Sequence, residues 1–306
     1  MNKLFGVSRS FASSAAKNAI NSVTVVGGGL MGSGIAQVAA QAGQNVIVVD
    51  VNQDVLDKAK KSIEINLQRV GRKLHKDDAA EIEEFVKNAA SHIKLTTKLE
   101  EGVGSDLIIE AIVEKLDVKQ ELFHKLDMLS GQHTILATNT SSISVNEIAN
   151  GINRKDRYGG LHFFNPVPVM RLLEVIKCDS TSESTLAAMM QWGKSIGKVC
   201  ITCKDTPGFV VNRLLGPYSA EALRMYERGD ASKEDIDIGM KLGAGFPMGP
   251  FELADYTGLD TNRFALGVMY RETKHPVFRP IPMLDKMVEE GTLGIKTGQG
   301  FYKYKK

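Results

Sequence analysis

Residues 22–36 read SVTVVGGGLMGSGIA, and this stretch decides the fold of the first half of the chain. A short apolar run ends at glycine, and small and apolar residues at helical spacing follow it. Gly27, Gly29 and Gly32 form the pattern G-x-G-x-x-G. The first glycine permits a tight turn, the second lets a pyrophosphate approach the backbone, and the third lets helix and strand pack closely. The stretch therefore predicts a strand, a phosphate-binding turn and a helix whose N-terminus faces an anion.

The next apolar run, NVIVVD, ends in Asp50, near the distance at which dinucleotide-binding folds carry an acidic residue. A carboxylate there hydrogen-bonds a ribose 2′-hydroxyl and would repel a 2′-phosphate. We therefore expect NAD rather than NADP as the cofactor. A glycine loop that binds no nucleotide is the alternative, because G-x-G-x-x-G by itself is weak evidence.

Strand-like and helical stretches alternate through residues 18–204. Further strands are expected at DLIIEAI (106–112) and TILAT (134–138), with helical stretches such as VKQELFHKLDML between them. This alternation predicts a parallel sheet covered on both faces by helices. Residues 53 to about 90 look helical throughout and indicate two helices folded back on each other. Basic residues of this insertion recur at spacings that can share one face: Lys58, Lys61, Arg69, Arg72 and Lys76.

Beyond KVCITCKDTPGF the strand signals stop, and one helical pattern follows another to the end of the chain. We place the domain boundary near Lys204 and expect Asp205 or Thr206 to cap a helix with Pro207 in its first turn. The predicted fold class is an α/β N-terminal Rossmann-like domain (18–204) with a helical hairpin insertion, followed by an all-α C-terminal domain (205–306).

The first 17 residues differ from the rest in composition. They contain basic residues, Ser and Ala, and the first acidic residue of the chain is Asp50. Arg9-Ser10-Phe11 resembles a matrix-protease cleavage site, so we expect residues 1–17 to be a mitochondrial presequence. A disordered basic tail of a cytosolic protein is the alternative.

Composition excludes several classes of function. A net charge of +2 over 306 residues is too small to argue for a nucleic-acid partner, and no apolar run is long enough to span a bilayer. We expect no metal site. Cys200 and Cys203 form a CxxC, but KVCITC alternates like a short strand, whereas a redox motif would place its second Cys at a helix start. We interpret both cysteines as structural, with a redox pair as the alternative.

The stretch GGLHFFNPVPVMRLLEVI (159–176) places a single His and a single Glu in apolar surroundings. A nicotinamide enzyme that oxidises an alcohol needs a base for the hydroxyl proton, and His titrates near neutral pH. The Pro-containing link could fold the two segments back as neighbours, so that Glu174 orients the ring of His162 and stabilises its imidazolium form. The alternative is a core His bonded to a backbone carbonyl, with Glu174 paired to a lysine.

Six segments together resemble the mitochondrial short-chain L-3-hydroxyacyl-CoA dehydrogenase family over nearly the whole chain after the first 17 residues. They are GGGLMGSGIAQVAA, TNTSSIS, GLHFFNPVPVMRLLEVI, KDTPGFVVNRLL, KLGAGFPMGPFEL and KTGQGFYKY. The resemblance implies NAD-dependent oxidation of L-3-hydroxyacyl-CoA to 3-ketoacyl-CoA in fatty-acid β-oxidation, in the mitochondrial matrix, by a homodimer. The substrate would lie between the two domains.

The resemblance also assigns site residues. The catalytic set would be His162 as general base, Glu174 as its partner, Ser141 on the 3-oxygen of the substrate, and Asn212. The cofactor would be bound by Gly27, Gly29, Leu30, Met31, Gly32, Asp50, Glu114, Lys119, Asn139, Asn165 and Lys296. The acyl-CoA substrate would contact Lys73, Lys119 and Ser141, with the coenzyme A adenosine on the helical insertion. Without the resemblance, the basic insertion is simply a solvated helix face.

Two rival functions stay open at this point. A related oxidoreductase could act on a sugar acid or a free hydroxy acid with the same His–Glu pair and no coenzyme A. A non-catalytic NAD-binding or structural protein could retain the fold, although such a role requires none of the four residues of the catalytic set.

Overall fold

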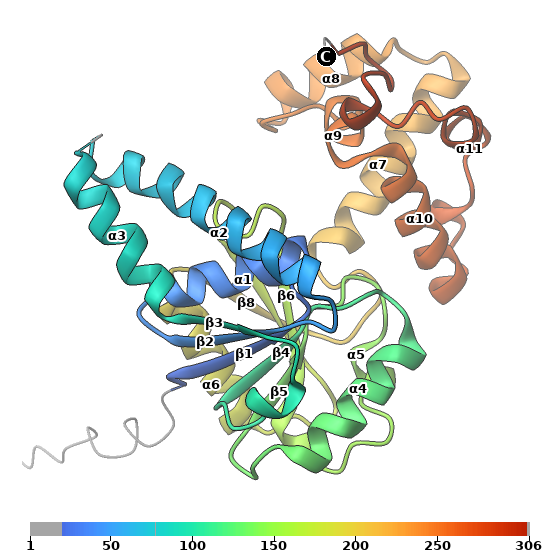
Figure 1. Ribbon diagram of the computed structural model, residues 1–306. Helices are drawn as coiled ribbons and strands as arrows, with labels where there is room; N and C mark the ends of the chain where they lie inside the picture. The colour runs from blue at the N-terminus through green and yellow to red at the C-terminus, as the bar shows by residue number, and fades with distance from the viewer. Residues whose placement is uncertain (1–19, 77, 305–306) are drawn as a thin grey trace, which may run out of the picture. The chain divides into compact units, whose positions relative to one another are not determined.

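The computed structural model describes residues 20–76 and 78–304 (Figure 1). The expected presequence, residues 1–17, lies outside this range. The chain divides into two compact units, one reaching to Asp205 and the other beginning at Thr206. The predicted fold class is confirmed: a Rossmann-like sheet domain precedes a helical domain.

An eight-stranded sheet in the order β3-β2-β1-β4-β5-β6-β7-β8 forms the centre of the first unit. The strands are β1 Ser22–Val26, β2 Asn45–Val49, β3 Ile93–Thr96, β4 Leu107–Glu110, β5 Ile135–Thr138, β6 Tyr158–Phe163, β7 Leu172–Lys177 and β8 Val199–Lys204. Strands β1 to β6 are parallel to one another, β7 is antiparallel to β6, and β8 is parallel to β7. The strand order reverses between β1 and β4, and ligands of such sheets bind at the carboxyl ends of the strands at this point.

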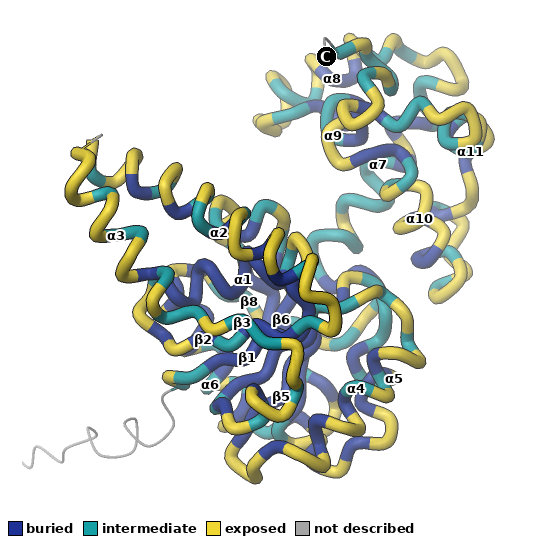
Figure 2. The backbone as a smooth tube through the Cα atoms, in the orientation of Figure 1, coloured by how far each residue is buried: buried dark blue, intermediate teal, exposed yellow. Residues whose placement is uncertain are grey.

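Helices connect these strands and cover the sheet. They are α1 Leu30–Gln41, α2 Gln53–Leu74, α3 Ala79–Ser91, α4 Leu116–Leu129, α5 Val145–Ile148 and α6 Glu183–Ser195, with the 3₁₀ turns η2 Leu99–Glu101 and η3 Lys155–Arg157. The α2–α3 pair forms the predicted hairpin and projects beyond the sheet (Figure 1). The central strands are buried, whereas the outward faces of the hairpin are exposed (Figure 2). Burial on both faces explains why these strands are apolar runs rather than alternating ones.

Among the described residues of the second unit, every named element is a helix or a 3₁₀ turn, and only isolated bridges occur near its end. Its helices are α7 Val211–Arg228, α8 Lys233–Gly243, α9 Pro250–Thr257, α10 Leu259–Thr273 and α11 Pro282–Glu289, with the 3₁₀ turns η4 Pro276–Phe278 and η5 Ile295–Thr297. They enclose a separate core that includes Leu223, Phe251, Leu266 and Phe278.

The predicted start of the first helix in this unit was wrong. Helix α7 begins at Val211, because a turn follows Thr206 in which Phe209 adopts φ of +50°. Asp205 is already used elsewhere: its carboxylate accepts hydrogen bonds from the Ser144 hydroxyl at 2.7 Å and the Asn146 backbone N–H at 2.8 Å, at the N-terminus of α5.

The CxxC pair lies within β8 rather than at a helix start, and both cysteines are free thiols. Burial raises the pKa of Cys200 and raises that of Cys203 to about 11. The thiolate is the reactive form of cysteine, so this environment favours the structural interpretation. Across residues 20–76 and 78–304, no helix combines the length and the apolar character that a bilayer span requires.

Candidate active site

The turn between β1 and α1 has the geometry that phosphate binding requires. Gly27 has φ of +109°, and a Cβ on Gly32 would overlap the carbonyl oxygen of Gly27. At Gly29, by contrast, an added Cβ would meet none of the surrounding atoms within 4 Å, so the backbone is open to a ligand there. Gly29 is also the N-cap of α1, whose N-terminus has no capping side chain and no acidic residue in its first turn. The N–H groups and the positive end of the helix dipole are thus left for an anion.

The neighbouring predicted cofactor contacts surround this turn. Leu30 and Met31 form the first turn of α1, with Leu30 exposed and Met31 half-buried. Asp50 directly follows β2, and its carboxylate accepts hydrogen bonds from the backbone N–H of Gly28 at 2.8 Å and of Asn52 at 3.0 Å. The acidic group therefore lies against the glycine turn, where a ribose joined to a pyrophosphate can reach it. The residues present fit an NAD-type dinucleotide.

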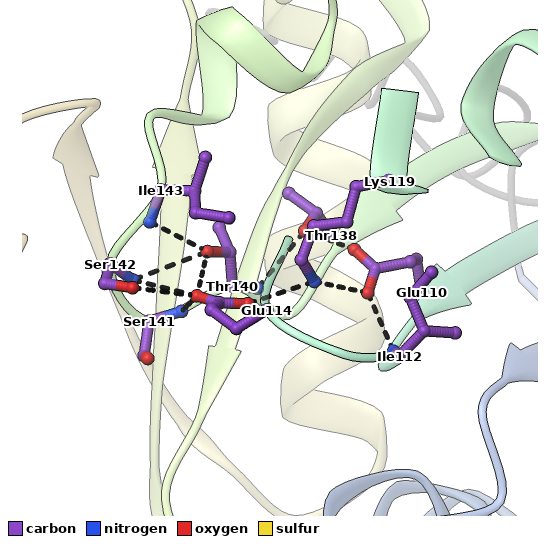
Figure 3. Close-up of polar contacts among 9 residues, drawn as sticks. All are labelled: Glu110, Ile112, Glu114, Lys119, Thr138, Thr140, Ser141, Ser142 and Ile143. Carbon is purple, nitrogen blue, oxygen red and sulfur yellow. Dashed lines mark hydrogen bonds and ion pairs between the residues drawn. The ribbon is translucent and has the colours of Figure 1, made fainter. Parts of the chain in front are cut away.

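A buried ionic cluster lies at the carboxyl end of β4 (Figure 3). Lys119, on α4, is only 1% exposed. Its Nζ lies 2.5 Å from Oε1 of the fully buried Glu110 and 3.1 Å from Oε2 of Glu114. Burial by itself would raise the pKa of Glu114, but the charge of Lys119 and the hydrogen bonds from Thr140, Lys119 and Ser141 hold it below its usual value.

Glu114 organises the loop that follows β5. Its Oε1 accepts hydrogen bonds from the Thr140 hydroxyl (2.5 Å), the Ser141 N–H (3.0 Å), and both the N–H (3.2 Å) and the hydroxyl (3.0 Å) of Ser142. Ser141 is exposed, and its hydroxyl points away from the carboxylate (Figure 3). A ligand lying over the loop can therefore reach this hydroxyl.

The same loop is joined to the strand that carries His162. Oδ1 of Asn139 accepts a hydrogen bond from the backbone N–H of Phe163 at 2.9 Å. Phe163 directly follows His162 on β6. The loop after β5 and the candidate base are thus positioned by one set of hydrogen bonds.

The structure brings His162 and Glu174 together. They are register partners on the antiparallel strands β6 and β7, and Nδ1 of His162 lies 2.7 Å from Oε2 of Glu174. His162 is 4% exposed and Glu174 is fully buried. The ring of His162 also contacts that of Phe164, with centroids 4.5 Å apart. A carboxylate on one ring nitrogen orients the imidazole and leaves the other ring nitrogen to accept a proton, as general-base chemistry requires.

The basic residues of the insertion gather on the outer face of α2. Lys58, Lys61, Arg69 and Arg72 are exposed on the side of the helix opposite its buried residues, with Lys73 beside them in the last turn. In the part of the chain that the structure describes, none of these five forms an ion pair with a carboxylate. Lys76 lies beyond the helix, at φ of +50°. The face therefore carries several cations that are free to meet phosphate groups.

The remaining predicted site residues lie in loops or in the second unit. Asn165 is exposed in the turn after β6. Asn212 is half-buried in the first turn of α7. Lys296 lies in η5, with its Nζ 2.5 and 2.7 Å from the two carboxylate oxygens of Asp260. The roles of all three stay predictions.

Two residues at the buried end of the ionic cluster, Glu110 and Thr138, were not among the site residues predicted from the sequence. Glu110 closes the apolar run DLIIE, and Thr138 closes TILAT, one strand further in the sheet. Oε2 of Glu110 accepts a hydrogen bond from the Thr138 hydroxyl at 2.7 Å. An acidic residue inside an apolar strand was the signal that identified Glu174, and the same signal was present at Glu110.

Comparison with known proteins gives a consistent result. Residues 22–206 match the family model "3-hydroxyacyl-CoA dehydrogenase, NAD binding domain", and residues 208–304 match "3-hydroxyacyl-CoA dehydrogenase, C-terminal domain". The mitochondrial hydroxyacyl-coenzyme A dehydrogenase of Sus scrofa is 53% identical over 296 residues, which cover 96% of this chain and 94% of that protein. The Homo sapiens protein of the same name is 54% identical over 301 residues, covering 97% and 96%. Among solved structures, (S)-3-hydroxybutyryl-CoA dehydrogenase from Ralstonia eutropha is 42% identical with a TM-score of 0.88, covering 94% of this chain and all of that one.

Proposed function

The chain belongs to the 3-hydroxyacyl-CoA dehydrogenase family, and from this premise we propose that it oxidises L-3-hydroxyacyl-CoA to 3-ketoacyl-CoA in fatty-acid β-oxidation. It is an NAD-dependent enzyme, and the open glycine turn and Asp50 are the residues that hold the cofactor. Bound NAD⁺ supplies the acceptor for the hydride that leaves C3 of the substrate.

The observation that carries the proposed mechanism is the buried pair of His162 and Glu174, 2.7 Å apart. His162 takes the proton of the 3-hydroxyl as the carbonyl forms at C3. Glu174 keeps the proton of the neutral ring on Nδ1, which directs Nε2 to the substrate, and its charge stabilises the imidazolium that results. General-base assistance of this kind contributes roughly 10²–10⁴-fold to turnover.

The outer face of α2 supports the coenzyme A part of the proposal. Coenzyme A carries several phosphate groups, and five exposed cations without carboxylate partners among the described residues provide a complementary surface. Lys73, in the last turn of α2, is the residue we assign to these phosphates. A free hydroxy acid or a sugar acid would have no use for this face.

The other residues of the proposed site contact either the reacting end of the substrate or the cofactor. Ser141 donates a hydrogen bond to the 3-oxygen, and Lys119 with Glu114 borders the bound cofactor. The cofactor contacts are completed by Asn139, Asn165 and Lys296. Asn212 contacts the reacting end of the substrate. Support for these roles comes from the matching motifs and, for Glu114, Asn139 and Ser141, from the hydrogen-bonded loop described above.

The relatives from Sus scrofa and Homo sapiens are named mitochondrial, which suggests the mitochondrion for this protein. We propose the matrix as its compartment and residues 1–17 as the targeting sequence. We also propose a homodimer formed by the second unit, which exposes Leu214 (69%), Leu242 (84%) and Phe264 (58%). Light scattering on the purified protein tests the dimer.

Oxidation of NADH by the purified protein, with acetoacetyl-CoA and free acetoacetate in parallel, tests the substrate. The proposal predicts rapid turnover of the thioester and little turnover of the free acid. Equal rates on both, or no activity on either, would contradict the acyl-CoA assignment while leaving the NAD-binding fold intact. Sugar acids would then be the next substrates to examine.

A further inference from the structure

The ionic cluster at the end of β4 contains a carboxylate that the proposed chemistry does not use. We propose that Glu110 is a positioning residue: it neutralises Lys119, so that the carboxylate of Glu114 stays bonded to the loop that carries Ser141. The catalytic consequence rests on the proposed function, because Ser141 is assigned there to the substrate.

The first step of the argument is the cost of burying Lys119. Its side chain is 1% exposed, and a buried ammonium is strongly unfavourable unless a carboxylate compensates it. Glu110 is the closer of its two carboxylate neighbours and is fully buried, whereas the side chain of Glu114 is 28% exposed. Glu110 is therefore the permanent counter-charge of Lys119.

The second step is that hydrogen-bond donors meet both carboxyl oxygens of Glu110. Its Oε1 accepts from Lys119 and from the backbone N–H of Ile112 at 2.8 Å, and its Oε2 accepts from the Thr138 hydroxyl at 2.7 Å. Each of these three partners is a donor, and an ionised carboxyl group has only acceptor sites. Donors on both oxygens fix the orientation of the group.

The third step concerns Glu114, which has two sets of partners. Its Oε2 faces Lys119 at 3.1 Å, while its Oε1 accepts four hydrogen bonds from Thr140, Ser141 and Ser142. Without the charge of Glu110, Glu114 is the remaining carboxylate beside Lys119 in this cluster. The ammonium would then draw the Glu114 carboxylate toward itself and away from the loop (Figure 3).

The loop is linked in turn to the base. Through Asn139 it is hydrogen-bonded to Phe163, the residue after His162. A charge at the buried end of β4 thus controls the position of Ser141 and supports the strand that carries the base, although Glu110 touches neither of them.

Hydrogen–deuterium exchange of the full-length protein tests this inference, because the N–H groups of Ser141 and Ser142 donate to Glu114. In the Glu110→Gln variant we expect these amides to exchange about 10- to 100-fold faster, the scale of losing one hydrogen bond to a charged group. The kcat/KM for acetoacetyl-CoA should fall by about 10- to 100-fold, mainly through kcat, because positioning at the reacting atoms is disturbed.

The matched control is Asp127→Asn. Asp127 is a buried carboxylate of the same unit, paired with Arg154 at 2.6 Å, and it has no part in the proposed site. Its replacement removes a comparable ion pair, so it should lower the melting temperature without selectively exposing the 139–142 loop. Should Glu110→Gln fail to fold, Glu110→Asp keeps the charge but shortens the side chain, which weakens the contact with Lys119 and should produce a smaller change of the same kind.

Unchanged exchange of Ser141 and Ser142 in the variants would overturn the inference. Exchange that rises equally in β1 and in the loop would also overturn it, because Glu110 would then serve only general stability. If the wild-type protein does not reduce acetoacetyl-CoA, the proposed function fails, yet a selective rise in loop exchange would still support the role of Glu110.

Discussion

Replacement of Glu174 by Gln is the most informative single change in the His–Glu pair. The amide is nearly isosteric with the carboxylate, and its oxygen can still accept a hydrogen bond from Nδ1 of His162 across the same 2.7 Å. The change therefore removes the negative charge and keeps the geometry. Because both side chains are buried, water can replace little of the lost stabilisation.

The size of the effect follows from the electrostatics of the pair. Exchanging a charge-assisted hydrogen bond for a neutral one costs about 1–2 kcal/mol. The full interaction of two unit charges 4 Å apart in a medium of effective dielectric constant 20 is about 4 kcal/mol, which sets the upper limit. The barrier to proton abstraction should thus rise by about 1–4 kcal/mol, and kcat should fall by about 5- to 10³-fold.

The assay is steady-state reduction of NAD⁺ with L-3-hydroxybutyryl-CoA, the direction in which His162 abstracts the proton, together with a fluorescence titration of NADH binding. Glu183→Gln is the control, since that side chain is 80% exposed in a surface ion pair with Lys177 and should leave kcat unchanged. Wild-type turnover in Glu174→Gln would refute the proposed role of the charge. Loss of NADH binding in this variant would show instead that Glu174 has a structural role.

Three further predictions concern the cofactor turn, the ionic cluster and α2. Gly32→Ala should abolish NADH binding in a fluorescence titration, because the new Cβ overlaps the Gly27 carbonyl oxygen. Glu114→Gln should lower the melting temperature most at neutral pH. The pKa of Glu114 is depressed in the folded protein, so its contribution is complete above the usual carboxyl pKa and is lost as the pH falls through the lowered value. The double variant Lys61→Glu/Arg69→Glu should raise the KM for acetoacetyl-CoA about tenfold or more at low salt, with kcat unchanged.

Each of these predictions has a clear contrary result. Normal NADH affinity in Gly32→Ala would mean that the turn can make room for the new Cβ and still bind the cofactor. A difference in melting temperature between Glu114→Gln and wild type that does not shrink in acid would contradict the direction of the pKa shift. If the α2 variant changed the KM for a short thioester lacking the nucleotide as much as that for acetoacetyl-CoA, the helix face would not be the site of the phosphates.

Most of the sheet could be predicted from the sequence because its strands are buried on both faces and stand out as apolar runs between glycines and helices. Strand β3 was missed, since IKLT has only two strongly apolar residues and lies at the edge of the sheet. The start of α7 was misplaced for a different reason. Its Thr-Pro pattern is typical of a helix start, but the turn at Phe209 and the use of Asp205 by α5 depend on tertiary contacts.

The candidate site, too, could be predicted from the sequence only in part. The Pro-containing link indicated that the segments of His162 and Glu174 could be neighbours, but only strand register makes them direct partners. The buried end of the ionic cluster could not be assembled from the sequence. Glu110, Lys119 and Thr138 come from β4, α4 and β5, and no local pattern reports that their side chains meet.

The most direct test of the central claim is the turnover of His162→Gln with acetoacetyl-CoA and NADH, with NADH binding measured on the same preparation. If His162 is the acid–base group, kcat should fall by roughly 10²–10⁴-fold while NADH binds as in the wild type. Near-normal turnover would contradict the assignment and would leave the buried His–Glu pair as part of the structural core.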